Sequence, residues 1–282
     1  MDNPSQIMNA LCVDLDDLAA ALHEAGFSGG ESEYLAYQET TDLLVELEAL
    51  RLKATFFVPG SIVRRSPELV KHVATARHHI ASHGSLHCKV GSFSRRAFME
   101  DVLTSKTTLE DLIGLPVDTY KAPIWSITPS CSWAYDVLIE AGFRVDNSAM
   151  PGLKSFLGQE PGRITPFTYK DQLVVIPPTT VHIAGVTVRF CGGFYTAYVP
   201  LSLQRIAFAS INRNGHPFNY YFHPFEHSPA PGNRRFIKHR SLYGSLYAAH
   251  SGVFKRHLRE LSRHFYFGTL PEAYALALRE LS

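Results

Sequence analysis

The chain has 282 residues, of which 45% are hydrophobic and 19% are charged, a balance typical of a soluble globular protein. Its formal net charge is +1 and charges of both signs are interspersed, which argues against a nucleic-acid or membrane-surface partner. The densest basic stretch, Asn233–Arg240, is expected to be a solvated loop. No apolar run approaches the roughly 18 residues of a membrane span, so stable membrane insertion is not expected.

The beginning of the chain, residues 1–6, has neither the charged nor the apolar region of a signal peptide. This pattern predicts a cytoplasmic protein. The four cysteines lie far apart with no CxxC pair, and we expect free thiols rather than disulfides. They are Cys12, Cys88, Cys131 and Cys191.

Short apolar runs alternate with helical patterns through the first half of the chain. A Gly- and Ser-rich loop is expected at 26–33. The Ser-Pro and Ser/Gly signals at helix ends set the expected helix boundaries. We expect strands at 10–13, 54–58, a run ending at 83, a run leading into 119–123 and 143–146, and helices from Thr41, from Ser66, over 94–114 and over 129–142.

The second half of the chain is less regular. It is expected to contain a loop at 151–166, strands at 173–177, 186–190, 218–222 and 265–267, a turn at 192–195, and helices at 201–212, 253–261 and from Thr269. Strands that alternate with helices of this length indicate a parallel α/β sheet or barrel. No internal repeat or linker divides the chain, so residues 1–282 are predicted to form a single domain.

Polar side chains gather where the predicted strands end. Asp14 and Asp16 follow the first strand, His83 and His87 follow the third, and Lys121 follows the fourth. In parallel α/β folds the ligand sites lie at the carboxyl ends of the strands. These side chains are therefore candidates for one common site.

One carboxylate and two imidazoles suit a divalent metal with open positions for water and substrate. A second carboxylate beside that water suits a general base. Each pattern also has a simpler interpretation. Asp14 and Asp16 are compatible with capping of a following helix, and His pairs four residues apart arise by chance. The chain holds three such pairs, His79/His83, His83/His87 and His223/His227.

Five short motifs occur in an order that resembles the polysaccharide deacetylase family, also described by NodB homology and as carbohydrate esterase family 4. Segments 192–195, 223–226 and 265–269 resemble the branch associated with bacterial exopolysaccharide and surface-glycan gene clusters. The five motifs are Val13–Asp17, Ala54–Gly60, Ser82–His87, Tyr120–Ser126 and Tyr221–Glu226.

This resemblance implies an irregular (β/α) barrel with extra β-structure in the middle of the chain. It implies that Asp16, His83 and His87 bind a metal, with zinc as the expected ion. It also implies that Asp14 is the base that activates water and that His223 is the acid that protonates the leaving amine. Without the resemblance, His223 is equally compatible with a packed histidine.

Position 121 departs from the family pattern, in which an arginine orients the base aspartate. Lys121 supplies the charge but not the bidentate fork of an arginine. Lys121 is therefore expected to be a catalytic residue that acts on Asp14 through its charge, without the two-point contact of an arginine.

Three further residues are candidates for substrate contact. Trp125 suits stacking on a sugar ring, with a core tryptophan as the alternative. A backbone N–H near Ile124 suits an oxyanion. Asp146, at a strand end, suits the tuning of His223, with loop capping as the alternative.

The expected activity is metal-dependent removal of an N-acyl group, expected to be acetyl, from an amino sugar of a bacterial surface glycan or its precursor. The expected partner is an N-acylated amino sugar, oligosaccharide or polysaccharide. One alternative is a catalytically silent glycan-binding homologue, which the lysine at position 121 motivates. Another is hydrolysis of a non-sugar amide or imide at the same metal site.

Overall fold

The computed structural model describes residues 7–16, 36–149, 165–183, 186–193, 198–228 and 252–279. The expected loop at 26–33, most of the expected loop at 151–166 and the basic stretch Asn233–Arg240 lie outside the described residues.

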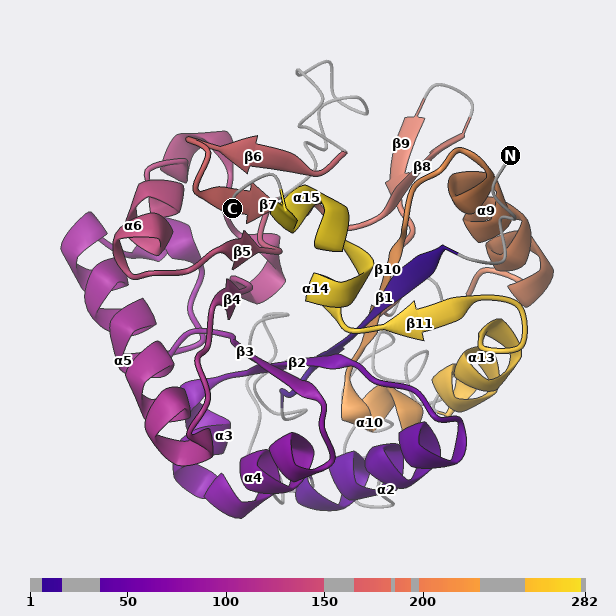
Figure 1. Ribbon diagram of the computed structural model, residues 1–282, viewed down its shortest axis with the longest axis horizontal. Helices are drawn as coiled ribbons and strands as arrows, with labels where there is room; N and C mark the ends of the chain where they lie inside the picture. The colour runs from indigo at the N-terminus through magenta and orange to yellow at the C-terminus, as the bar shows by residue number, and fades with distance from the viewer. Residues whose placement is uncertain are drawn as a thin grey trace, which may run out of the picture.

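A nine-stranded sheet curls around the centre of the molecule (Figure 1). Its order is β10-β1-β2-β3-β4-β5-β7-β6, and β11 pairs with β1. The pairs are parallel except β6 with β7, which confirms the predicted parallel α/β architecture. The strands are β1 (Met8–Asp14), β2 (Thr55–Val58), β3 (His79–Ser82), β4 (Thr119–Tyr120), β5 (Val145–Asp146), β6 (Phe167–Tyr169), β7 (Leu173–Val175), β10 (Asn219–Phe222) and β11 (Tyr266–Gly268).

Helices form a ring outside the sheet, and a separate hairpin of β8 (Thr180–Ile183) and β9 (Val186–Arg189) supplies the extra β-structure predicted for the middle of the chain (Figure 1). The outer helices are α2 (Ala36–Ala49), α3 (Gly60–Arg65), α4 (Pro67–Thr75), α5 (Arg95–Ile113), α6 (Ala134–Glu140), α9 (Leu201–Arg213) and α13 (Val253–Leu261). The described residues also contain the short α-helices α10 (Pro224–His227), α14 (Leu270–Ala273) and α15 (Ala275–Arg279), and 3₁₀ helices at Val90–Ser92, Pro123–Trp125 and Pro129–Cys131.

Strand alternation divides the side chains between two cores. Leu11 and Val13 belong to the larger core, which lies between the sheet and the outer helices. Ala10 and Cys12 belong to a smaller core that includes Leu270 of α14, the helix seen inside the ring of strands in Figure 1. Because successive side chains of a strand point to opposite faces, the side chains that follow Cys12 in steps of two continue along the inner face.

Helix boundaries follow the predicted signals only in part. The helix expected from Thr41 already includes Ala36, and the helix expected over 129–142 is a 3₁₀ helix at Pro129–Cys131 followed by α6. Ser94 caps α5 by accepting a hydrogen bond from the Ala97 N–H, and Gly114 ends it in the left-handed conformation, as predicted. Ser66 precedes α4, but its side chain makes no cap hydrogen bond. The helix α3, which begins directly after Pro59, was not predicted, because Pro-Gly ordinarily indicates a turn.

Among the described residues, no helix is both long enough and apolar enough to cross a bilayer. The cytoplasmic location and the single-domain organisation stay predictions.

Buried histidines predict a loss of stability in acid. Burial lowers the pKa of His78 to about 4, and its Nδ1 accepts a hydrogen bond from the Ala54 N–H. The unfolded-state pKa is about 6.5, so the stability that neutral His78 provides is present above that value and is lost as the pH falls toward 4. The variant His78→Asn keeps an acceptor but cannot titrate in this range. Between pH 7 and pH 5, we expect the free energy of unfolding of wild type to fall by about 1 to 2 kcal/mol more than that of His78→Asn.

Urea unfolding at the two pH values measures this difference. His72→Asn is the control, because His72 is an exposed histidine on α4. This variant should show the same pH dependence as wild type. Equal losses for wild type and His78→Asn would contradict the prediction.

Candidate active site

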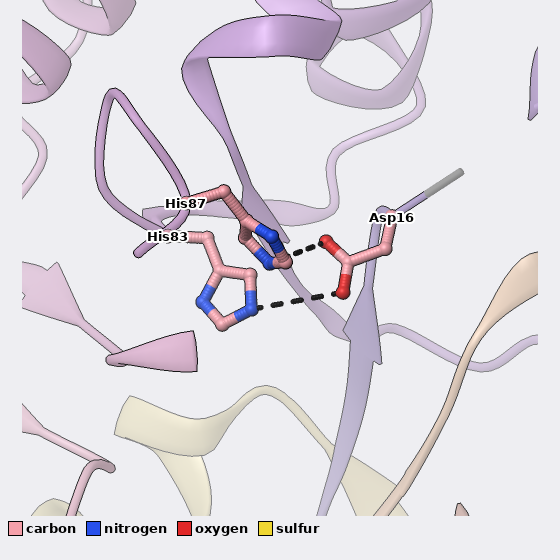
Figure 2. A group of neighbouring side chains, drawn as sticks. All are labelled: Asp16, His83 and His87. Atoms are coloured by element: carbon pink, nitrogen blue, oxygen red, sulfur yellow. Dashed lines mark ion pairs between the residues drawn. The ribbon is translucent and has the colours of Figure 1, made fainter. Parts of the chain in front are cut away.

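Three potential metal ligands meet at the carboxyl ends of β1 and β3 (Figure 2). Asp16 lies two residues beyond β1, and His83 and His87 lie in the loop that follows β3. One ligand atom from each side chain lies within 4.8 Å of the others. The structure thus brings together the three residues that the sequence predicts as ligands.

The hydrogen bonding of His83 defines how its ring faces the carboxylate. Nδ1 lies 2.6 Å from the backbone carbonyl oxygen of Lys121, and since a carbonyl can only accept, Nδ1 carries the hydrogen. The other nitrogen, Nε2, then presents a lone pair 3.9 Å from Asp16 Oδ2. Two acceptors that face each other in a buried site repel, and a cation between them removes the repulsion. A carboxylate with two imidazoles also suits zinc, so these residues fit a divalent metal.

The pKa values of these groups reflect burial and close charges. Burial alone raises the pKa of Asp16, but His87 and His83 together lower it well below its usual range. Burial lowers the pKa of His83, although Asp16 opposes this effect. The cluster therefore holds Asp16 as an ionised carboxylate, the form that metal binding requires.

The turn between the two histidines is held by a helix. Asp101 of α5 accepts hydrogen bonds from the N–H groups of Ser85 at 3.1 Å and Leu86 at 2.8 Å. Gly84 has φ of 76°, and a Cβ there would lie 2.9 Å from Asp101 Oδ2. The glycine is therefore required for the backbone to approach the carboxylate. Asp101 and Gly84 together fix the loop that carries His83 and His87.

A buried ion pair lies beside this cluster. Lys121 Nζ contacts Asp14 Oδ2, and both side chains are almost completely buried. Among the described residues, no group donates a hydrogen bond to Asp14 Oδ1, which is also buried. One oxygen of Asp14 is thus committed to the lysine, and the other is available to a water molecule or substrate.

His223 follows β10 and approaches the same cluster. Its Nε2 lies 3.7 Å from Asp16 Oδ2, and its Nδ1 lies 3.0 Å from Glu226 Oε2. The same Glu226 oxygen accepts the backbone N–H of His223 at 2.8 Å. Burial lowers the pKa of His223, but Glu226 outweighs it and raises the pKa to about 9. Glu226 therefore holds His223 as a proton donor.

Asp146 occupies a different place from the one expected. It is completely buried and accepts hydrogen bonds from the Ser148 N–H and hydroxyl, and burial raises its pKa to about 7. The carboxylate at Nδ1 of His223 is that of Glu226, which corrects the expectation that Asp146 tunes this histidine. With no exposed surface, Asp146 supports the loop at Ser148 instead of contacting a substrate.

Trp125 and Ile124 lie in an unusual stretch of backbone. Their φ angles are 50° and 58°, and a β-branched residue in this region is rare enough to indicate a local constraint. Ile124 is 36% exposed, whereas Trp125 is only 7% exposed and packs over Lys121. Its burial is closer to that of a core tryptophan than to that of an open sugar platform.

Sequence reasoning missed the functions of Glu226 and Asp101. Glu226 stands three residues after His223, the spacing of a capping box, and this spacing is a usable signal. Asp101 is a charged residue on the apolar face of α5 beside Phe98 and Val102, but only the tertiary structure shows what it binds.

Two family models match the sequence. Residues 33–143 match the model described as polysaccharide deacetylase, and residues 147–275 match a domain of unknown function (DUF3473). The fold and the donor set define a (β/α)-barrel protein with a carboxylate–imidazole cluster at its mouth. The match over residues 33–143 supports a member of the polysaccharide deacetylase family.

Two curated relatives match less than half of the chain. A chitooligosaccharide deacetylase of Bradyrhizobium sp. (strain ANU 289) is 27% identical over 117 residues, which are 39% of this chain and 51% of that protein. A peptidoglycan-N-acetylglucosamine deacetylase of Bacillus cereus is 25% identical over 126 residues, 42% of this chain and 46% of that protein. The matches thus span about half the length of these relatives.

Solved structures match the fold over its whole length. A Mycobacterium smegmatis protein provisionally named a polysaccharide deacetylase has a TM-score of 0.65 at 19% identity, covering 100% of this chain and 94% of that chain. The Puue allantoinase has a TM-score of 0.62 at 14% identity, and the match covers 99% of this chain and 91% of that chain. At these identities the likeness confirms the predicted barrel fold alone.

The hydrogen bonds from Ser85 and Leu86 to Asp101 can be tested without any ligand. Asp101→Asn replaces one acceptor oxygen with an N–H₂ group that faces a backbone N–H. We expect a loss of about 1 to 3 kcal/mol in the free energy of unfolding. We also expect faster amide exchange at Ser85 and Leu86, measured by hydrogen–deuterium exchange.

Asp111→Asn is the matched control, because Asp111 is an exposed residue on the same helix. Unchanged exchange at Ser85 and Leu86 in Asp101→Asn would show that the carboxylate does not hold the turn.

Proposed function

We propose that this protein is a metal-dependent carbohydrate N-deacetylase. The observation that carries the proposal is the buried Asp16–His83–His87 cluster, flanked by Asp14 on one strand end and His223 on another. Hydrolysis of an amide needs a polarised carbonyl, an activated water and a proton for the amine, and this set of side chains can supply all three. Family membership adds independent support.

The names of the curated relatives support one substrate class. Both curated relatives are named as deacetylases, one of a chitooligosaccharide and one of N-acetylglucosamine in peptidoglycan. We therefore propose an N-acetylated amino sugar, in a bacterial surface glycan or its precursor, as the substrate.

Asp16, His83 and His87 are the proposed metal ligands, with zinc as the expected ion. When bound, a divalent ion would supply Lewis acidity to the acyl carbonyl. The chain contributes the geometry. The Lys121 carbonyl orients His83, and Asp101 orients the loop that carries His87.

Asp14 is the proposed general base. Its Oδ2 is held by Lys121, so its Oδ1 can accept a proton from a water molecule in the site. Lys121 keeps the Asp14 carboxylate in place while Oδ1 accepts the proton. Ile124, partly exposed at the same end of the sheet, is the proposed backbone donor to the substrate oxygen.

His223 is the proposed general acid. Glu226 accepts the Nδ1 hydrogen and favours the protonated ring, so Nε2 carries a proton toward the centre of the site. Transfer of that proton to the nitrogen of the breaking amide would let the free amino sugar leave.

Replacement of the two catalytic candidates tests the proposal. We expect metal-loaded wild type to release acetate from one or more members of a panel of N-acetylated amino sugars and oligosaccharides. Asp14→Asn and His223→Gln are each expected to lower kcat by about 10²- to 10⁴-fold, because each removes a proton-transfer group. Acetate and free amine are measured together.

Exposed residues of the same types provide the controls, Asp42→Asn and His216→Gln. Absence of acetate release from the whole panel, with a known deacetylase active in parallel, would contradict the proposal and favour a silent glycan-binding homologue. Release of ammonia or acid from a cyclic imide or formamide in place of the sugars would favour the non-sugar amidase.

Metal binding provides a separate test of the ligand set. After chelation and dialysis, we expect wild type to bind one zinc ion per chain. We expect His87→Gln to lower the affinity by more than the roughly 10- to 100-fold that loss of an outer partner costs. Calorimetry and elemental analysis measure both quantities.

The variant Asp42→Asn should bind zinc as wild type does. An affinity for zinc that is the same in wild type, His87→Gln and Asp16→Asn would exclude the proposed ligand set.

A further inference from the structure

Three aromatic rings surround the ammonium group of Lys121. Its Nζ lies 4.4 Å from the ring centroid of Trp125, 4.5 Å from that of Tyr221 and 5.2 Å from that of Phe57. The lysine is only 1% exposed, and its ion-pair partner is Asp14. We call Trp125, Tyr221 and Phe57 the lysine cage.

The lysine cage offsets part of the free-energy cost of burying the Lys121 ammonium group. An ammonium group removed from water loses its hydration, and a single carboxylate contact does not replace all of it. Ring faces attract a cation most strongly where water is excluded, which is the situation of Lys121. A compact ammonium group fits between three rings, whereas the planar fork of an arginine presents a different shape.

The backbone around the cage is built to place the rings. Trp125 and Tyr221 meet edge to face with centroids 4.6 Å apart and planes at 89°. A Cβ at Gly192 would lie 2.0 Å from the Tyr221 carbonyl oxygen, and a Cβ at Gly193 would lie 2.1 Å from its hydroxyl oxygen. Both glycines also have positive φ. Only glycine lets this segment pack against Tyr221.

We propose that Trp125 and Tyr221 are positioning residues that hold the Lys121 ammonium group on Asp14, so that Asp14 keeps one oxygen directed at the reacting water. The proposal deepens the function above and rests on it for the catalytic effect. It assigns Trp125 to the cation instead of to a sugar ring. It also assigns a task to the region of unknown function at 147–275, which contributes Tyr221 and its two glycines.

A double-mutant cycle on stability tests the contact itself. Trp125→Leu and Tyr221→Leu remove a ring, Trp125→Phe and Tyr221→Phe keep one, and Lys121→Met removes the charge. We expect each leucine change to be coupled to Lys121→Met by about tenfold in the unfolding equilibrium constant, and the phenylalanine changes to keep most of the wild-type coupling. Lys121→Gln replaces Lys121→Met should the latter not fold.

Trp133→Leu is the matched control, since Trp133 is a half-buried tryptophan that packs on Phe98. It should lose stability without coupling to position 121. A coupling at Trp125 and Tyr221 no larger than that of Trp133 would overturn the cage.

Kinetics test the positioning effect. We expect Trp125→Leu and Tyr221→Leu to lower kcat about tenfold with KM within about twofold, because the loss concerns the base and not substrate binding. Phenylalanine at either position should restore most of the loss. In the Lys121→Met background the leucine changes should have no further effect on kcat, and zinc affinity should stay at the wild-type value.

The outcomes separate the possible explanations. A rise in KM at unchanged kcat for Trp125→Leu, in both backgrounds, would show that the tryptophan binds sugar and would overturn the proposal. Wild type that is inactive on every N-acetylated sugar would refute the proposed deacetylation, while the stability cycle would still decide the cage independently.

Discussion

A strand in a curled parallel sheet can direct only every second side chain to the inside, and this constraint determines which residues meet at the mouth of the barrel. Cys12 belongs to the inner core, and Asp14 and Asp16 continue its face. Ala81 and His83 follow the same rule on β3, as do Tyr221 and His223 on β10. A shift of one residue in any of these strands would turn its functional group into the apolar layer beneath the helices.

The charges gathered by this alternation are balanced in pairs. Asp14 is matched by Lys121, and His223 is matched by Glu226, which leaves Asp16 as the carboxylate shared among His83, His87 and His223. Lys121 and Glu226 each neutralise their own partner, so the imidazoles around Asp16 keep its carboxylate ionised. A buried carboxylate surrounded by imidazoles attracts a divalent cation strongly.

The sequence predicted most strands, most helices and the ligand candidates because each leaves a local pattern, whereas β6 and β8 were not predicted. Apolar runs ending in Asp14 or His83 identify strand ends, and Ser94 with Gly114 identifies a complete helix. What the sequence could not provide is the contact between elements. The function of Asp101 depends on how α5 crosses the histidine loop.

The same limit applies to Tyr221, because the choice between it and Tyr220 as the ring beside Lys121 depends on sheet register. The site residues also belong to neither matched region alone. Residues 33–143 contain His83, His87 and Lys121, whereas residues 147–275 contain His223 and Glu226. Asp14 ends β1 and Asp16 follows it, both outside the two matched regions, and β1 pairs with β2 on one edge and with β10 on the other. β1 therefore joins the halves, and the barrel can assemble this site only when both regions fold against it.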